Sequence, residues 1–152
     1  MKPNILRRKL LETTAGLAAL ALARPALATS DQMKAAIAGF AGGAAVTRGK
    51  VTIDVAQLID NGNAVPITVR VDSPMSATEH VTAIAVFNEK NPQPDVVRFT
   101  LGPRSGKAVV STRIRLATSQ KLTAVARLSD GSFWSGTADV IVVLAACVEG
   151  DG

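Results

Sequence analysis

The stretch Ile67-Thr68-Val69-Arg70-Val71-Asp72 alternates apolar and polar residues without a break. Successive side chains of a β-strand point to opposite faces of its sheet, so this alternation predicts a strand with one dry face and one wet face. A sheet with a wet face is typically antiparallel, because parallel sheets are covered on both faces. Similar β-branched runs predict seven strands in all, at residues 50–55, 65–72, 81–87, 96–101, 108–116, 121–129 and 133–144.

Turn residues separate these runs, and no helical pattern lies between them. Asn61-Gly62-Asn63 precedes one strand, Asn91-Pro92-Gln93-Pro94 precedes another, and Asp130-Gly131 is a strong hairpin signal between the last two. Seven short strands at this spacing predict an all-β fold, an antiparallel β-sandwich formed by one domain.

A short helix is predicted ahead of the strands, at residues 31–41. Its apolar residues fall on one stripe: Met33, Ile37, Phe40 and Ala41. Ser30 or Asp31 can cap its start, and Gly42-Gly43 follows its end. We expect this helix to pack on the sandwich.

Residues 1–28 have the features of a cleaved export signal. Arg7-Arg8-Lys9-Leu10-Leu11 resembles a twin-arginine motif, and Ala26-Leu27-Ala28 fits a cleavage site before residue 29. The apolar stretch between them is about nine residues, too short for a membrane anchor. An ordinary secretory signal is the alternative. Either way we expect residues 29–152 to form one periplasmic domain, exported already folded if the signal is of the twin-arginine type.

Charge and composition exclude several functions. The chain has 17 Lys and Arg against 12 Asp and Glu, but the signal holds five of the bases and one acid, which leaves 12 bases and 11 acids. A nearly neutral domain with five aromatic residues is not expected to bind nucleic acid. One cysteine and one histidine cannot form a disulfide or an ordinary Cys/His metal site, and no cofactor motif is present.

The lone cysteine, Cys147, is the candidate functional residue. It lies three residues after the predicted end of the last strand, next to a tail with two glycines and two acids that we expect to be mobile. An inert packed cysteine is the alternative, because free cysteines are often buried. The acids disfavour the thiolate, and no base lies close in sequence, so the thiol looks like an attachment point and not an autonomous nucleophile.

The last predicted strand ends in a continuous apolar run at residues 140–146. Such a run belongs either to a central strand or to one covered by another chain, and the pattern leaves both open.

Six segments carry a resemblance to a known family: Asn61-Gly62-Asn63-Ala64-Val65-Pro66, Val71-Asp72-Ser73-Pro74-Met75, Phe87-Asn88-Glu89-Lys90-Asn91-Pro92, Phe99-Thr100-Leu101-Gly102-Pro103, Ser111-Thr112-Arg113-Ile114-Arg115-Leu116 and Asp130-Gly131-Ser132-Phe133. With them the chain resembles the SoxY family of sulfur-oxidation carrier proteins. The resemblance implies an immunoglobulin-like sandwich and a heterodimer with a SoxZ-like subunit. It also implies that Cys147 carries thiosulfate-derived sulfur as a covalent adduct, on which periplasmic sulfur-oxidation enzymes act.

The chain departs from that family around the cysteine. The family typically has Gly-Gly-Cys-Gly-Gly, whereas this sequence has Ala145-Ala146-Cys147-Val148-Glu149. Alanine and β-branched valine give a stiffer segment than glycine. We therefore expect either partner enzymes with a wider channel or an altered substrate.

The other candidates have ordinary structural explanations beside functional ones. His80 is expected at the surface and Trp134 in the core or at an interface. Arg113 and Arg115 are expected on one outer face, where they meet an anionic adduct or a partner surface, or simply aid solubility. The alternative for the whole protein is a structural or binding β-sandwich with an incidental thiol. A thiol oxidoreductase is disfavoured, because no resolving cysteine is present.

Overall fold

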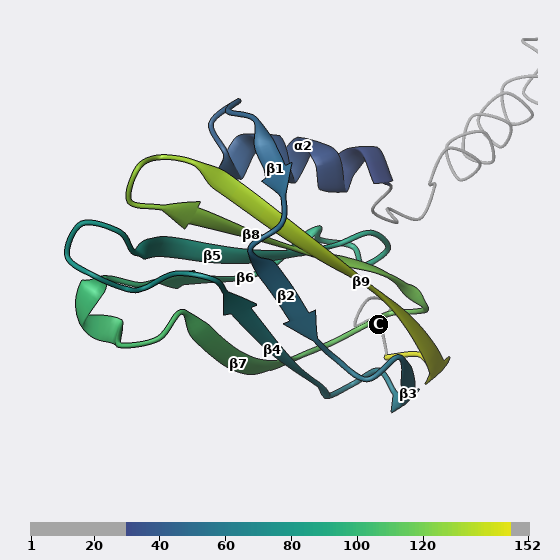
Figure 1. Cartoon of the computed structure of the whole chain (residues 1–152). Helices are drawn as coiled ribbons and strands as arrows, with labels where there is room; N and C mark the ends of the chain where they lie inside the picture. The colour runs from purple at the N-terminus through teal and green to yellow at the C-terminus, as the bar shows by residue number, and fades with distance from the viewer. Residues whose placement is uncertain (1–29, 147–152) are drawn as a thin grey trace, which may run out of the picture.

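The computed structural model describes residues 30–146, so the predicted signal at 1–28, Cys147 and the predicted tail lie outside the described residues. One helix, α2 (Ser30–Phe40), precedes nine strands (Figure 1). The strands are β1 (Val46–Arg48), β2 (Val51–Asp54), β3 (Leu58–Asn61), β4 (Val65–Val71), β5 (Val81–Asn88), β6 (Asp95–Thr100), β7 (Val109–Ile114), β8 (Gln120–Leu128) and β9 (Phe133–Leu144), with a 3-10 turn, η1 (Pro103–Ser105), between β6 and β7.

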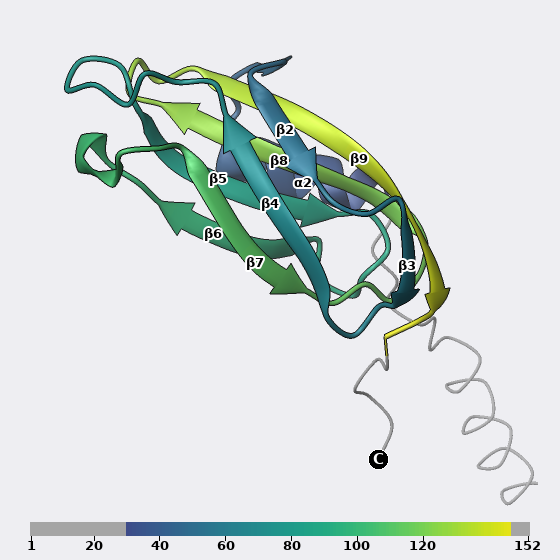
Figure 2. The ribbon, with the colours of Figure 1, turned by 60° about the horizontal axis from the view of Figure 1, so that its bottom comes forward.

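The strands form two sheets that face each other (Figure 2). The larger has the order β1-β9-β8-β5-β6, with β3 also paired to β9, and the smaller has the order β2-β4-β7. The predicted all-β sandwich, its seven strands and its helix are confirmed, with strand ends shifted by one or two residues.

Two strands were not predicted, and they correct the expectation of a purely antiparallel sandwich. β1 and β3 have three and four residues, too few to show alternation, and both pair with β9 in parallel. The larger sheet is therefore mixed, while the other pairings are antiparallel.

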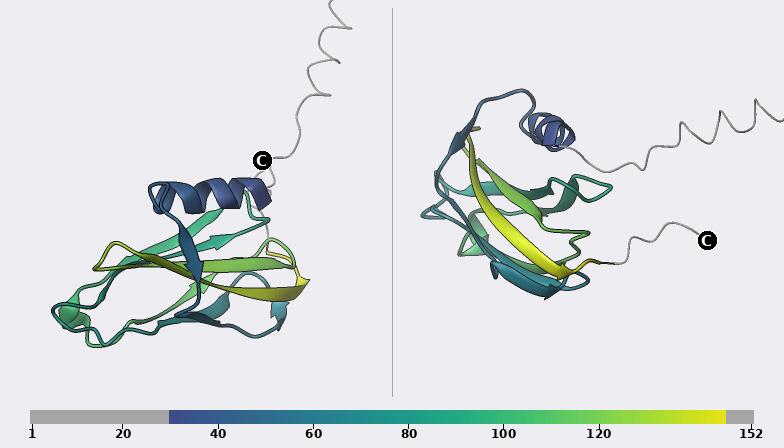
Figure 3. Two further views of the ribbon diagram at one scale, coloured as in Figure 1. Left: turned by 45° about the horizontal axis from the view of Figure 1, so that its top comes forward. Right: turned by 90° about the vertical axis from the view of Figure 1, so that its right-hand side faces the viewer.

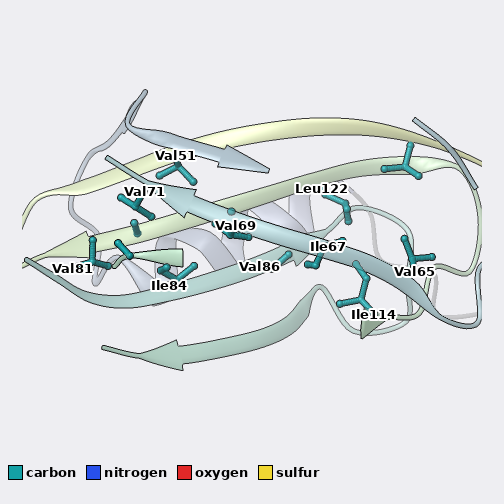
Figure 4. Packing of buried hydrophobic residues seen from close by; sticks show 14 of the residues in the cluster. Val51, Val65, Ile67, Val69, Val71, Val81, Ile84, Val86, Ile114 and Leu122 are labelled. Carbon is teal, nitrogen blue, oxygen red and sulfur yellow. The ribbon is translucent and has the colours of Figure 1, made fainter. Parts of the chain in front are cut away.

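The core lies between the two sheets. Along β4, Val65, Ile67, Val69 and Val71 are buried, and Ile84 of β5 belongs to the same cluster (Figure 4). The polar residues between them on β4 stay half-buried or exposed. The alternation of the sequence thus fixes the face on which β4 packs.

The helix covers the outer face of the larger sheet (Figure 3). Its Met33 is buried against a second cluster that includes Phe87 of β5. The Phe40 ring meets the rings of Phe87 and Phe133 edge-on, at centroid distances of 6.0 and 5.8 Å. The helix gives way to Gly42 at a φ of +61°, a conformation that favours glycine. β5 is therefore buried on both faces.

No helix in the range 30–146 is long and apolar enough to cross a membrane.

Candidate functional site

The end of β9 is tied to two other parts of the fold by backbone hydrogen bonds. The Gly62 N–H donates to the Leu144 carbonyl (2.8 Å), and the Leu116 N–H donates to the Gly62 carbonyl (2.8 Å). The Ala146 N–H in turn donates to the Leu116 carbonyl (3.1 Å). Ala146 is only 7% exposed. The described chain therefore stays attached to the sandwich through Ala146.

This attachment determines where the chain that leads to Cys147 can leave the sheet. A segment leaving the sheet at Leu144 would carry the thiol about 10 Å outward over three residues. Because Ala146 is bonded and buried, any such departure begins after it. Consecutive Cα atoms lie about 3.8 Å apart, so Cys147 begins within one residue of the place where Ala146 is held.

Ala146 lines a groove of about 640 Å³ on one side of the sandwich. The groove opens between β6 and β7, the strands that end the larger and smaller sheets on that side. The connection from β5 to β6 contributes Asn91, Pro92 and Gln93 to its lining.

Two arginines give the groove a positive character. Arg113 and Arg115 line it, both are exposed, and neither belongs to an ion pair among residues 30–146. The acid in the lining, Asp95, is already bonded to Arg98 through Nε at 2.7 Å. Guanidinium groups bind oxyanions through charge-assisted hydrogen bonds. The groove can therefore receive an anion.

Asn88 adds a neutral polar group to the lining. It is fully buried, and neither its Nδ2 nor its Oδ1 has a hydrogen-bond partner among residues 30–146. A buried polar group without a partner costs about 1–3 kcal/mol, so this amide lowers the stability of the fold.

A polar network fixes the rim of the groove. Asn91 accepts at Oδ1 from the Ala117 N–H (2.9 Å) and from Gln120 Nε2 (2.8 Å), and its Nδ2 donates to the Arg115 carbonyl (2.8 Å). Gln120 Oε1 accepts from the Lys90 N–H at 2.8 Å. These bonds hold the β5–β6 connection against the backbone of Arg115.

The structure brings together some of the predicted candidates and separates others. Arg113 and Arg115 lie with Ala146 on the groove, whereas Cys147 lies outside the described residues. His80 precedes β5 at the end opposite Asn88, where its Nδ1 lies 3.1 Å from the Ser76 carbonyl. Trp134 packs against the core under the Lys50 ammonium, 4.9 Å from the ring centroid. His80 and Trp134 do not line the groove.

Sequence reasoning missed Asn88, Asn91 and Gln120. The turn signal of Asn91-Pro92 was visible, but a polar side chain is recognised as buried only once its neighbours in space are known. Across residues 30–146 there is no group of three or more His, Cys, Asp or Glu side chains able to hold a metal ion.

The first alternative for the apolar run at the end of β9, a central strand, is confirmed, and cover by another chain stays a prediction. β9 is flanked by β8 on one side and by β1 and β3 on the other, so it is a central strand. Nevertheless its end exposes Ile141 (55%), Val143 (61%) and Leu144 (64%), beside Leu58 of β3 (59%). These four residues are named the apolar end patch below.

A family comparison matches residues 37–147 to the sulfur oxidation protein SoxY. The chain belongs to the SoxY family. The matched segment spans the sandwich and ends at Cys147. SoxY is a sulfur-oxidation carrier, so the family supports a carrier role for this chain over an enzymatic one.

Solved structures agree with this membership. The sulfur carrier protein SoxY from Chlorobium limicola f thiosulfatophilum is 27% identical, with a TM-score of 0.65, and the match covers 76% of this chain and all of that one. A putative superoxide reductase from Thermotoga maritima is 20% identical, with a TM-score of 0.55, over 64% of this chain and 93% of the other. At that identity the second likeness concerns the fold alone. A search of curated proteins found no significant match.

Proposed function

We propose that this SoxY-family protein carries thiosulfate-derived sulfur as a covalent adduct on Cys147. The observation that carries the proposal is that the segment matched to SoxY ends one residue after Ala146, which lines the groove. That last residue is Cys147, the chain's one cysteine. The groove holds two arginines that form no ion pair within residues 30–146. The thiol is thus supplied to partner enzymes beside an anion-binding surface.

The loading step requires a partner. The Cys147 thiol and thiosulfate form one new S–S bond, giving Cys147–S–S–SO₃⁻. The thiol proton is released and two electrons leave, so a partner oxidoreductase must accept them. The described residues next to Cys147 in sequence, Ala145 and Ala146, cannot deprotonate the thiol. In this proposal the partner enzyme therefore activates the thiol, and the chain is its substrate.

The groove suits the charged end of such an adduct. A sulfonate has three acceptor oxygens and a negative charge, which Arg113 and Arg115 can neutralise at the rim. A neutral thiol without the adduct has no charge for these arginines to bind.

The test is intact-protein mass spectrometry after incubation with thiosulfate and an extract of cells that oxidise it. The expected result is a thiosulfonate mass increase on the wild type and none on Cys147→Ser. Ser111→Ala, an exposed substitution on β7, is the matched control and should be loaded as the wild type is. A wild-type protein that stays unmodified while a known SoxY in the same extract is loaded contradicts the proposal.

The partner in this proposal includes a SoxZ-like subunit. The apolar end patch supports it, because an exposed cluster of large apolar side chains on the strand that leads to Cys147 is typical of a protein interface. The proposed setting is the periplasm, reached through the signal at residues 1–28.

The second candidate function is a structural β-sandwich subunit with an incidental thiol, and the same patch favours it. Cys147→Ser separates the two functions. A structural subunit retains its pathway activity with serine, whereas a carrier loses it.

A further inference from the structure

We propose that Gly62 is a positioning residue that clamps the root of the carrier segment, so that Cys147 starts from a fixed point beside the groove. This role deepens the proposed function and rests on it. Gly62 lies in the turn between β3 and β4, far in sequence from the cysteine that it positions.

The clamp is a chain of three backbone hydrogen bonds. It runs from the Leu144 carbonyl to Gly62, from Gly62 to Leu116, and from the Leu116 carbonyl to the Ala146 N–H, at 2.8, 2.8 and 3.1 Å. Leu116 is fully buried, so it is a fixed anchor. Gly62 thus contacts the end of β9 directly and also bonds the N–H of Leu116, the residue whose carbonyl accepts from Ala146.

Only glycine fits at the centre of this arrangement. A Cβ added to Gly62 would lie 2.3 Å from the Leu116 carbonyl oxygen and 3.0 Å from the Ala146 nitrogen. Both atoms belong to the backbone, which cannot turn aside as a flexible side chain would. Any larger residue therefore separates Leu116 and Ala146 from residue 62 and opens the clamp.

The clamp restricts the reach of the thiol. With it closed, the chain is held as far as Ala146. Opened, it releases Ala145 and Ala146, about 7 Å of extended chain. Stiff alanines in place of the family's glycines thus have little effect while the clamp is closed, since Ala146 is already held.

The experiment uses the chain's single cysteine. A nitroxide spin label is attached to Cys147, and its electron paramagnetic resonance spectrum is compared between the wild type, Gly62→Ala and Gly102→Ala. Gly102 is the matched control, because it has an extended φ of −153° and nothing within 4 Å of an added Cβ. Hydrogen exchange of the Ala146 amide is measured on the unlabelled proteins, with the Val125 amide in the core as internal reference.

We expect Gly62→Ala to sharpen the label's spectrum and to lower the protection of the Ala146 amide at least tenfold, while Val125 stays protected. Gly102→Ala should match the wild type in both measurements. Ala146→Pro is the second variant, because it deletes the donor N–H and leaves Gly62 in place. It should also sharpen the spectrum, and it carries the test alone if Gly62→Ala does not fold.

A wild-type spectrum in the folded variants, with an unchanged Ala146 amide in Gly62→Ala, would overturn the role of Gly62. A general destabilisation would expose Val125 together with Ala146, and this outcome also contradicts a local clamp. Neither readout depends on sulfur loading. Failure of Cys147 to accept thiosulfate therefore leaves the clamp standing, and failure of the clamp leaves the carrier role standing.

Discussion

At the scale of single residues, Asn88 is the side chain whose burial has the clearest cost. Its amide is sealed from solvent, and within the part of the chain that the structure describes neither polar atom has a partner. We predict that Asn88→Val raises the free energy of unfolding by about 1 kcal/mol, because it removes an unsatisfied polar group and valine suits a strand. Urea denaturation measures this change.

Asn91→Val is the comparison, since Asn91 is fully bonded, and it should lower stability by about 1–3 kcal/mol. A loss of stability in Asn88→Val as large as that in Asn91→Val would show that Asn88 is satisfied after all.

Asp130 is the residue whose titration the fold changes. The Ser132 hydroxyl and the Ser132 N–H donate to its Oδ1, at 2.7 and 2.9 Å, and they lower the pKa of Asp130 below its usual 3.8. Because the folded state favours the charged form, the contribution to stability is complete above the unfolded pKa. It is lost as the pH falls through the lowered folded pKa.

We therefore predict that Asp130→Asn lowers the melting temperature at neutral pH and reduces its further fall near pH 3. Thermal denaturation at the two pH values measures both effects. Parallel pH profiles for the wild type and the variant would contradict the assignment.

At the scale of elements, β9 depends on a close approach to β2. A Cβ added to Gly136 of β9 would lie 2.1 Å from the Val51 carbonyl oxygen. We predict that Gly136→Ala lowers the free energy of unfolding by about 1–3 kcal/mol, because a packed backbone must move apart. Gly102→Ala, in open space, should stay within about 0.5 kcal/mol of the wild type in the same urea titration.

Strand prediction succeeded where the local pattern reports burial. β4 alternates because one face packs on the core, and the pattern is written in its own residues. Val46–Arg48 and Leu58–Asn61 are strands only because β9 lies beside them. Segments of three or four residues are too short to show an alternation that would predict this pairing. Their parallel direction is likewise a property of the assembled sheet.

The residue types of the candidate site could be predicted from the sequence, but their arrangement in space could not. A lone cysteine and two neighbouring arginines are visible in the sequence. That Ala146 is bonded to Leu116, and that Arg115 shares its groove, depends on contacts between residues about thirty positions apart. Local periodicity carries no information on such contacts.

At the scale of the whole molecule, the apolar end patch should determine whether the protein keeps a partner. We predict that Ile141→Lys reduces association with the SoxZ-like subunit at least tenfold without unfolding the domain, because the side chain is already exposed. Co-purification and size-exclusion chromatography measure the association. Thr137→Lys, also exposed on β9, is the control that should retain the partner, and equal behaviour of the two variants would place the interface elsewhere.

The parallel pairing of β1 and β3 with β9 has a consequence for how the protein is made. Synthesis runs from the N-terminus, so both short strands leave the ribosome some seventy residues or more before the strand that receives them. Contacts of such long sequence separation form late in folding. In a nascent chain that has not reached Phe133, β1 and β3 therefore lack the strand with which they pair. Both segments stay available to chaperones during that interval.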